Sequence, residues 1–198
     1  MPLGCLMTAS PVVAAAILVV GILVAGFGYF NWNVDLLGIG APDFQNLVFS
    51  PDSQRISNPD GSYFQISFEK TADSQFSGLV RHVSPIRLAR IPILTHDILI
   101  TFGDYADPRK VTTSVIDHHF FWSSTSKQPQ GGINLLHTIP KNETIYRQLL
   151  EIKTGQNVRI RGREILGLDA FSSENHLDMF WQDSGCNSLL VDSVEIEK

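Results

Sequence analysis

Residues 11–30 read PVVAAAILVVGILVAGFGYF, an apolar stretch without a charged side chain. A helix of about 20 apolar residues matches the thickness of the hydrocarbon core of a bilayer. Later apolar clusters are shorter and are interrupted, as between Ile86 and Leu94, by arginine and proline. We therefore expect one transmembrane helix at about 11–30, within an N-terminal segment 1–34, and a single pass through the membrane.

The flanks of this stretch indicate its processing and orientation. A secretory signal peptide begins with a basic region, whereas the first Lys or Arg of this chain is Arg55. An uncleaved anchor is therefore favoured, and Val24-Ala25-Gly26 leaves a cleaved signal as the alternative. Asp35 and Asp43 follow the helix, which favours an N-terminus inside and a soluble domain outside the cytoplasm.

Composition limits the partners of the remaining chain. The 198 residues carry 15 basic and 20 acidic side chains, a net charge of -5. Because nucleic-acid binding requires a dense basic face, no nucleic-acid partner is expected. Cys5 and Cys186 would lie on opposite sides of the membrane, so they would not pair. Gly21 and Ala25 would let two membrane helices approach, which leaves a homo-oligomer open without other support.

The chain changes character twice after the anchor. Residues 35–60 contain several Gly and Pro and predict a linker with one short strand at Leu47–Phe49. From Tyr63, apolar and polar residues alternate, which is typical of half-buried strands. Residues 61–198 therefore predict a soluble, mainly β domain. Its expected strands are Tyr63–Phe68, Phe76–Val83, Ile86–Leu94, Asp97–Phe102, Val111–Trp122, Ile133–Ile139, Val158–Ile165, Leu177–Trp181 and Leu189–Ile196.

One helix is expected inside this β domain, at about residues 141–154. Asn142 is suited to cap its N-terminus, and Gly155 is suited to end it. Ile145, Leu149 and Ile152 recur at helical spacing and form one apolar face. A mainly β domain with one inserted helix favours a small barrel or a curled antiparallel sheet.

Several short motifs in this domain are similar to those of a known family. GQNVRIRG, residues 155–162, resembles the G-x-x-V-x-I-x-G strand of OB-fold and related small barrels. The wider pattern consists of HDILI at 96–100, FFW at 120–122, HTIPKNE at 137–143 and WQDSGC at 181–186. Together these motifs resemble an uncharacterised family of bacterial single-pass membrane proteins with an OB-like extracytoplasmic domain. The resemblance covers roughly Tyr63 to the C-terminus. It implies a fold and a topology, and no catalytic residue.

Three arginines form the first candidate site. Arg159, Arg161 and Arg163 would lie on one face of the strand Val158–Ile165, because successive side chains of a strand point to opposite faces. Such a row is commonly a solvated face. Its functional interpretation is a binding surface for an anionic ligand or a lipid headgroup.

The densest polar set of the chain mixes carboxylates and imidazoles, which are ligands of Zn²⁺. Its members are His96, Asp97, Asp104, Asp107, Asp117, His118 and His119. Because His118 and His119 would face opposite sides of one strand, only one of them could join Asp104 and Asp107. The candidate metal site is therefore Asp104, Asp107 and His118. Its spacing matches no known metal motif, and aspartates beside a proline are also common in turns.

The motifs of nucleophilic catalysis are missing from the sequence. No G-x-S-x-G elbow occurs, and Ser184-Gly185-Cys186 fits a tight turn capped by Asp183. We therefore expect no catalytic residue and no cofactor. The sequence favours a membrane-anchored, non-enzymatic binding or assembly module of the cell envelope, which contacts the bilayer through residues 11–30 and an envelope protein through its β domain. The alternative is a membrane-tethered metal-dependent hydrolase that uses Asp104, Asp107 and His118.

Overall fold

The computed structural model describes residues 44–88, 91–183 and 185–197. The predicted membrane helix at 11–30 and the rest of the segment 1–34 lie outside these residues. None of the helices in the described ranges has the length and the apolar character needed to cross a bilayer. The described residues belong to the predicted β domain, 61–198, and to positions 44–60 of the predicted linker.

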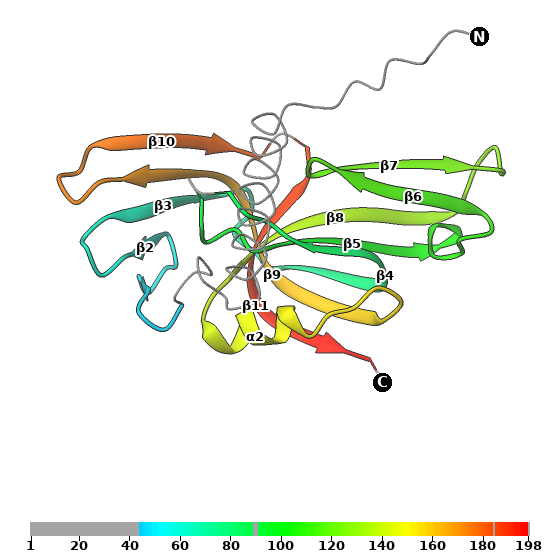
Figure 1. The fold of residues 1–198 in the computed structure, drawn as a ribbon, viewed down its shortest axis with the longest axis horizontal. Coiled ribbons are helices and arrows are strands. Elements are labelled where there is room, and N and C mark those ends of the chain that lie inside the picture. Colours follow the sequence, from blue (N-terminus) through cyan, green and yellow to red (C-terminus); the bar gives the residue numbers. More distant parts are fainter. Residues whose placement is uncertain (1–43, 89–90, 184, 198) are drawn as a thin grey trace, which may run out of the picture. The chain divides into compact units, whose positions relative to one another are not determined.

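The described chain is mainly β, with one α-helix and one short 3-10 helix (Figure 1). The strands are β1 (Val48–Phe49), β2 (Arg55–Ser57), β3 (Tyr63–Phe68), β4 (Ser74–Pro85), β5 (His96–Gly103), β6 (Val111–Ile116), β7 (His119–Ser124), β8 (Gly131–Pro140), β9 (Asn157–Phe171), β10 (Leu177–Gln182) and β11 (Asn187–Ile196). The helices are η1 (Asp104–Ala106) and α2 (Glu143–Leu150).

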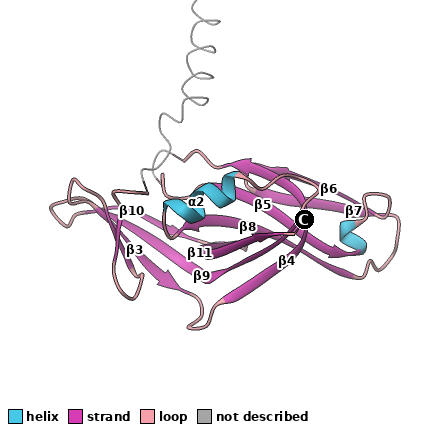
Figure 2. Cartoon of the chain, turned by 90° about the horizontal axis from the view of Figure 1, so that it is seen from below, coloured by secondary structure: helices cyan, strands magenta, loops and turns pink. Residues whose placement is uncertain are grey.

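Five strands close into a small barrel, in the order β4-β5-β8-β11-β9 and back to β4. β8 and β11 are parallel, and the other four pairs are antiparallel. Apolar side chains such as Ile98, Leu136 and Ile160 form the barrel core and are almost fully buried. Helix α2 packs against β8 and β11 (Figure 2). The prediction of a mainly β fold with a small barrel and one helix is confirmed.

β9 joins two parts of one nine-stranded sheet, the barrel and an extension that we call the outer sheet. Residues 157–165 pair with β4 and β11 in the barrel, and residues 165–171 pair with β3. β10 lines the other edge of this second half, while β2 and β1 extend the sheet beyond β3. Figure 1 shows β3 and β10 on one side of the molecule and the β6–β7 hairpin on the other. A second buried cluster, with Ile56, Phe64 and Leu168 among its members, packs this outer sheet.

The segment predicted as a linker contributes to this outer sheet. β1 and β2 lie within residues 35–60, and β1 falls in the short strand expected at Leu47–Phe49. Ile56 of β2 is completely buried. The apolar side chains of this segment are widely spaced, so their burial depends on a tertiary partner that the local sequence does not indicate.

Two of the predicted strands are wrong. The described residues of Ile86–Leu94 connect β4 to β5 without forming a strand, and their buried isoleucines pack into the second cluster instead. Val111–Trp122 is a hairpin rather than one strand. Asp117 and His118 have φ angles of 49° and 62° and form its two-residue turn. Two consecutive positive φ angles are typical of a type I′ turn, which is usually built from Asn or Asp followed by Gly.

The helix is shorter than predicted. Its N-terminus is as expected: the Asn142 side chain accepts a hydrogen bond of 3.0 Å from the backbone nitrogen of Ile145. It ends at Leu150 rather than near residue 154. Ile152 leaves the helix to join the barrel core, and the backbone nitrogen of Gly155 donates to Val80 on β4. Packing against the barrel therefore overrides the helical spacing of the last turn.

Replacing Asn142 with Ala is expected to lower the free energy of unfolding by about 1 kcal/mol, the usual value of an N-cap. Chemical denaturation of the full-length chain, followed by tryptophan fluorescence, measures this loss. Asn142→Asp is the matched control, since its carboxylate can still accept the hydrogen bond from Ile145. Equal denaturation midpoints for the Ala and Asp variants would show that the cap does not stabilise α2.

Candidate functional site

Asp97 and His137 are neighbours on the barrel, because the register of β5 and β8 places them opposite each other. His118 reaches the same place from the turn between β6 and β7. Its Nδ1 lies 2.8 Å from Asp97 Oδ2, and His137 Nε2 lies 3.2 Å from Asp97 Oδ1. One ligand atom from each residue lies within 4.8 Å of those of the other two. We call Asp97, His118 and His137 the Asp97 cluster.

Most of the Asp97 cluster is shielded from water. Asp97 is 2% exposed and His137 is 7% exposed, whereas the His118 side chain is 34% exposed. Asp97 Oδ1 and His137 Nδ1 have no hydrogen-bond partner among the described residues. The approach of His137 Nε2 to Asp97 Oδ1 is not aligned as a hydrogen bond, and this nitrogen also lies 3.3 Å from the carbonyl oxygen of His118. Each unsatisfied buried polar atom costs about 1–3 kcal/mol.

The exposed side of the cluster faces a pocket of about 250 Å³. His118 and His137 form part of its wall. The connection from β4 to β5 adds the apolar side chains Ile86, Leu88 and Leu94, and the chain around the end of β10 adds Trp181, Asp183 and Cys186. The pocket therefore combines an apolar rim with a polar wall, as small ligand sites commonly do.

Cys186 lies beside the cluster, with its Sγ 3.7 Å from the carbonyl oxygen of His118. Burial, followed by the negative charges of Asp183 and Asp97, raises the pKa of this thiol. Because the thiolate is the reactive form, this environment opposes a nucleophilic role. The Asp183 carboxylate accepts hydrogen bonds from the backbone nitrogens of Cys186 and Ser188, so the predicted turn cap is confirmed.

His96 precedes Asp97 but faces other surroundings. Its ring centroid lies 6.1 Å from that of Tyr146 on α2. Burial lowers the pKa of His96 to about 4, against the opposing effect of Asp97. The imidazole is therefore neutral at neutral pH. It lies between strand and helix and lines neither this pocket nor the Asp97 cluster.

The metal site predicted from Asp104, Asp107 and His118 is not assembled. Asp104 and Asp107 lie before β6, whereas His118 lies after it, and six residues of strand span about 20 Å. Asp104 pairs with Lys110 at 2.6 Å, and Asp107 pairs with Arg109 at 2.9 Å. The side chain of Asp104 also accepts from the backbone of Gln130. Both aspartates thus organise their own loop, and His118 joins the Asp97 cluster instead.

The three predicted arginines alternate with buried residues along β9, as a strand face requires. Arg159 pairs with Glu195 at 2.9 Å. The guanidinium carbon of Arg163 lies 3.6 Å from the centre of the Phe68 ring, and its Nη1 donates to the carbonyl oxygen of Asp52 at 3.4 Å. Two of the three side chains are therefore engaged within the chain. Their predicted role in binding stays a prediction.

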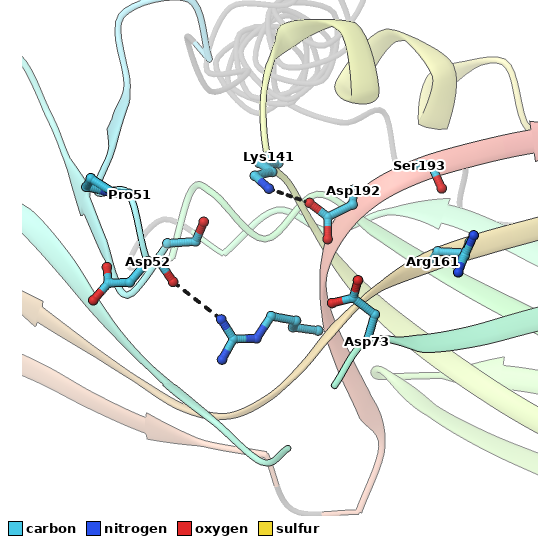
Figure 3. A pocket seen from close by; sticks show the side chains of 9 residues that line it. Pro51, Asp52, Asp73, Lys141, Arg161, Asp192 and Ser193 are labelled. Carbon is cyan, nitrogen blue, oxygen red and sulfur yellow. Dashed lines mark hydrogen bonds and ion pairs between the residues drawn. The ribbon is translucent and has the colours of Figure 1, made fainter. Parts of the chain in front are cut away.

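Arg161 and Arg163 line a second pocket, of about 490 Å³, shown in Figure 3. Its charged side chains are Asp52, Asp73, Lys141, Arg161, Arg163 and Asp192. Lys141 and Asp192 form an ion pair of 2.6 Å across its upper edge. Because three carboxylates balance the three basic groups, the pocket is not the uniformly positive surface that an anionic ligand favours.

In the sequence, Asp97 belongs to the densest polar set but not to the predicted metal site, and His137 appears only as the first residue of the HTIPKNE motif. The pairing of β5 with β8 brings these two residues together, although 40 positions separate them in the sequence (137 minus 97). The signal that could have indicated them is a titratable side chain within each of two strands rich in leucine and isoleucine, HDILI and NLLHTI.

No protein family model matches this chain, and no curated protein matches it.

Proposed function

We propose that this chain is a non-enzymatic binding module built on an OB-like barrel. In this proposal residues 11–30 anchor it in the membrane, the β domain lies outside the cytoplasm, and its partner is another protein of the cell envelope. The resemblance to single-pass bacterial membrane proteins with an OB-like domain, drawn from the sequence motifs, supports the same reading.

The strand connections support the OB-like assignment. In chain order the barrel strands are β4, β5, β8, β9 and β11, and we number them from first to fifth in that order. The third and fifth are the parallel pair, the first pairs with both the second and the fourth, and α2 lies between the third and the fourth. These connections in a closed five-stranded barrel therefore favour an OB-like fold.

The position of the 250 Å³ pocket is the observation that carries the proposal. OB barrels bind ligands on the face of their second and third strands, beside the loops that join the first strand to the second and the fourth to the fifth. This pocket has His137 from the third strand in its wall. Leu88 and Leu94 come from the first of those loops, and Asp183 and Cys186 come from the second. The likeness to OB barrels concerns the fold and the position of the pocket. The kind of ligand follows from the chemistry of the surrounding surface.

The surface around the pocket favours a protein partner. The neighbouring hairpin exposes large apolar side chains, with Ile116, Phe121 and Trp122 each about half exposed or more. Exposed aromatic and aliphatic groups of this kind are enriched at protein interfaces. Asp117 and Asp183 in the pocket wall and the net charge of -5 oppose nucleic acid. The hydrolase alternative receives no support, because His118 lies at the opposite end of β6 from Asp104 and Asp107.

A photo-crosslinking amino acid at Leu88 is expected to capture one envelope protein in intact cells of the native host. Leu88 lines the pocket and is exposed, so the substitution disturbs little. The same amino acid at Leu150 is the matched control, because this leucine is exposed on α2 and is not part of the pocket wall. Mass spectrometry of the crosslinked band identifies the partner.

Crosslinks at Leu150 that match those at Leu88 would contradict a pocket-centred interaction. The absence of any crosslink at Leu88, in cells where the chain is abundant, would contradict the binding-module proposal. Fractionation of the same cells tests the anchor, since recovery of the intact chain in the soluble fraction would contradict it.

A further inference from the structure

We propose that Asp97, His118 and His137 bind a divalent first-row transition-metal ion of the Zn²⁺ type. The site would use one ligand each from β5, from β8 and from the β6–β7 turn. It would lie in the wall of the pocket proposed above for a protein partner, but neither proposal requires the other.

The donor set suits such an ion. Two imidazoles and one carboxylate recur at zinc sites and at other first-row metal sites, where water or a substrate completes the coordination. The three ligand atoms already lie within 4.8 Å of one another. Zn²⁺ binds imidazole nitrogen and carboxylate oxygen at about 2.0–2.2 Å, so only small side-chain movements would bring all three to an ion.

The unsatisfied atoms of the cluster give an independent argument. Asp97 is a carboxylate shielded from water, and its Oδ1 has no hydrogen bond within the described chain. Burial of a carboxylate is costly unless a cation or a set of donors compensates it. Among the described residues, Asp97 forms ion pairs with His118 and His137 and with no lysine or arginine. A divalent ion would supply the missing charge and coordinate the free oxygen.

The backbone of His118 supports a dedicated position for its imidazole. A φ of 62° is costly for a residue with a Cβ atom, and glycine is usual at this place in the turn. Strained residues persist where the surrounding structure holds them, and they concentrate at functional sites. Here the turn projects the imidazole onto Asp97 over the exposed side of the cluster. The ring is partly open to the pocket, which gives an ion and a further ligand access.

A purely structural role is the competing explanation. His118 could hold the hairpin against the barrel through its hydrogen bond to Asp97 and through the contact of its carbonyl oxygen with His137 Nε2. This role predicts that the variants lose stability without any metal being bound by the parent chain. Metal binding and stability must therefore be measured separately.

Metal binding is measured on the full-length chain in detergent, after removal of metals with a chelator. Competition between the protein and a chromophoric chelator gives the affinity and stoichiometry for Zn²⁺, and Co²⁺ serves as a spectroscopic probe. We expect one ion per chain, and no comparable binding of Mg²⁺ or Ca²⁺, which prefer oxygen ligands. Asp97→Asn, His118→Gln and His137→Gln should each weaken Zn²⁺ binding at least about tenfold, since even the loss of an outer-shell partner costs about 10–100-fold.

His119→Gln and His176→Gln are the matched controls. His119 is adjacent to His118 in sequence but contacts the carbonyl oxygen of Asp117, and His176 lies in the loop between β9 and β10. Both variants should keep the affinity of the parent chain. His118→Gln is the variant least liable to misfold, because its side chain is partly exposed on the hairpin turn.

Two results would overturn the proposal. The first is a folded, metal-stripped parent chain that takes up no stoichiometric Zn²⁺ or Co²⁺. The second is equal weakening of Zn²⁺ binding in the cluster variants and in the histidine controls. Because this measurement uses the isolated chain, its failure would leave the crosslinking result for the protein partner unaffected, and the reverse also holds.

Discussion

Gly162→Ala is expected to destabilise the barrel by about 3 kcal/mol or more, the upper range of overpacking costs. Gly162 lies in β9 at a point where both edges of the strand are paired, with Ser74 of β4 and with Val191 of β11. A Cβ atom added here would lie 2.1 Å from the carbonyl oxygen of Leu190 and 2.9 Å from its carbonyl carbon. Both are backbone atoms of β11, so relief requires a shift of a whole strand.

The conflict cannot be absorbed by rotation of a side chain. Next to this point, the pairing of β11 with β9 shifts register between Val191 and Ser193. Moving β11 away from β9 would also disturb its parallel pairing with β8. The loss should therefore appear as a lower midpoint of denaturation for the entire barrel, with reduced yield of folded chain.

Gly167→Ala is the matched control in the same strand. Its added Cβ would meet only the carbonyl oxygen of Trp181, at 3.2 Å, on the outer strand β10. We expect a loss of less than about 1 kcal/mol, within the usual range for a tolerated substitution. If Gly162→Ala and Gly167→Ala unfold at the same denaturant concentration as the parent chain, the close approach of β9 and β11 is not a constraint on the fold.

Glu164→Gln is expected to lower the free energy of unfolding by about 2 kcal/mol at neutral pH, as for loss of hydrogen bonds to a charged group. Glu164 is buried on β9, where Lys70 lies 2.9 Å from Oε1 and the hydroxyl of Ser74 donates to the same oxygen. Burial alone would raise the pKa of this carboxyl from 4.5, but the hydrogen bonds from Ser74 and Lys70 outweigh it and the pKa is lowered.

The effect of Glu164→Gln should therefore depend on pH. A carboxyl whose pKa is lower in the folded state stabilises the fold above the unfolded pKa, here 4.5. This stabilisation is lost as the pH falls through the folded pKa. The difference in unfolding free energy between the parent chain and the variant should be largest near neutrality and should shrink as the pH falls below 4.5.

Glu195→Gln gives the control for this measurement. Glu195 also pairs with an arginine, Arg159, but 57% of its side chain is exposed. Exposed ion pairs contribute less than about 1 kcal/mol, so little change is expected at any pH. An equal effect of the two substitutions, or a Glu164→Gln effect that does not vary with pH, would show that Glu164 acts by packing and not by its charge.

The sequence predicts most strands correctly because their alternation has a direct physical cause, the burial of one face. Tyr63–Phe68 and the arginine-rich start of β9 show this clearly, and the N-cap at Asn142 follows from equally local chemistry. The prediction is wrong where apolar residues are buried without forming a strand. Ile86–Leu94 is apolar because its side chains fill the second core cluster, and that requires no strand.

The local sequence pattern did not indicate the turn at Asp117 and His118, for another reason. β-branched and aromatic residues run through Val111–Trp122, and Asp-His lacks the glycine that marks most two-residue hairpins. The candidate site depended on this turn. With His118 in the middle of a strand, a site with Asp104 and Asp107 is reasonable, whereas the hairpin moves His118 to the far end of β6.

The Asp97 cluster could not be derived from the sequence because it depends on three long-range relations. β5 must pair with β8 in one register, and the hairpin inserted between them must fold back over that pair. A change of one residue in the register of β5 would place Asp97 on the opposite face from His137. Sequence composition indicated carboxylate and imidazole groups, but it grouped His118 with Asp104 and Asp107, whereas the structure brings His118 to Asp97 and His137.

The closing pair of the barrel has a consequence for the order of folding. Ser74 at the start of β4 pairs with Gly162 of β9, 88 positions later (162 minus 74), so β4 leaves the ribosome well before the strand that closes against it. β3 must wait still longer, because Tyr63 pairs with Phe171. Contacts of such long range slow folding and leave strand edges open meanwhile. Early pairing with β5 covers only Leu79–Pro85 of β4, so in the nascent chain the edges of β3 and of the first half of β4 that face β9 stay unpaired until β9 is made.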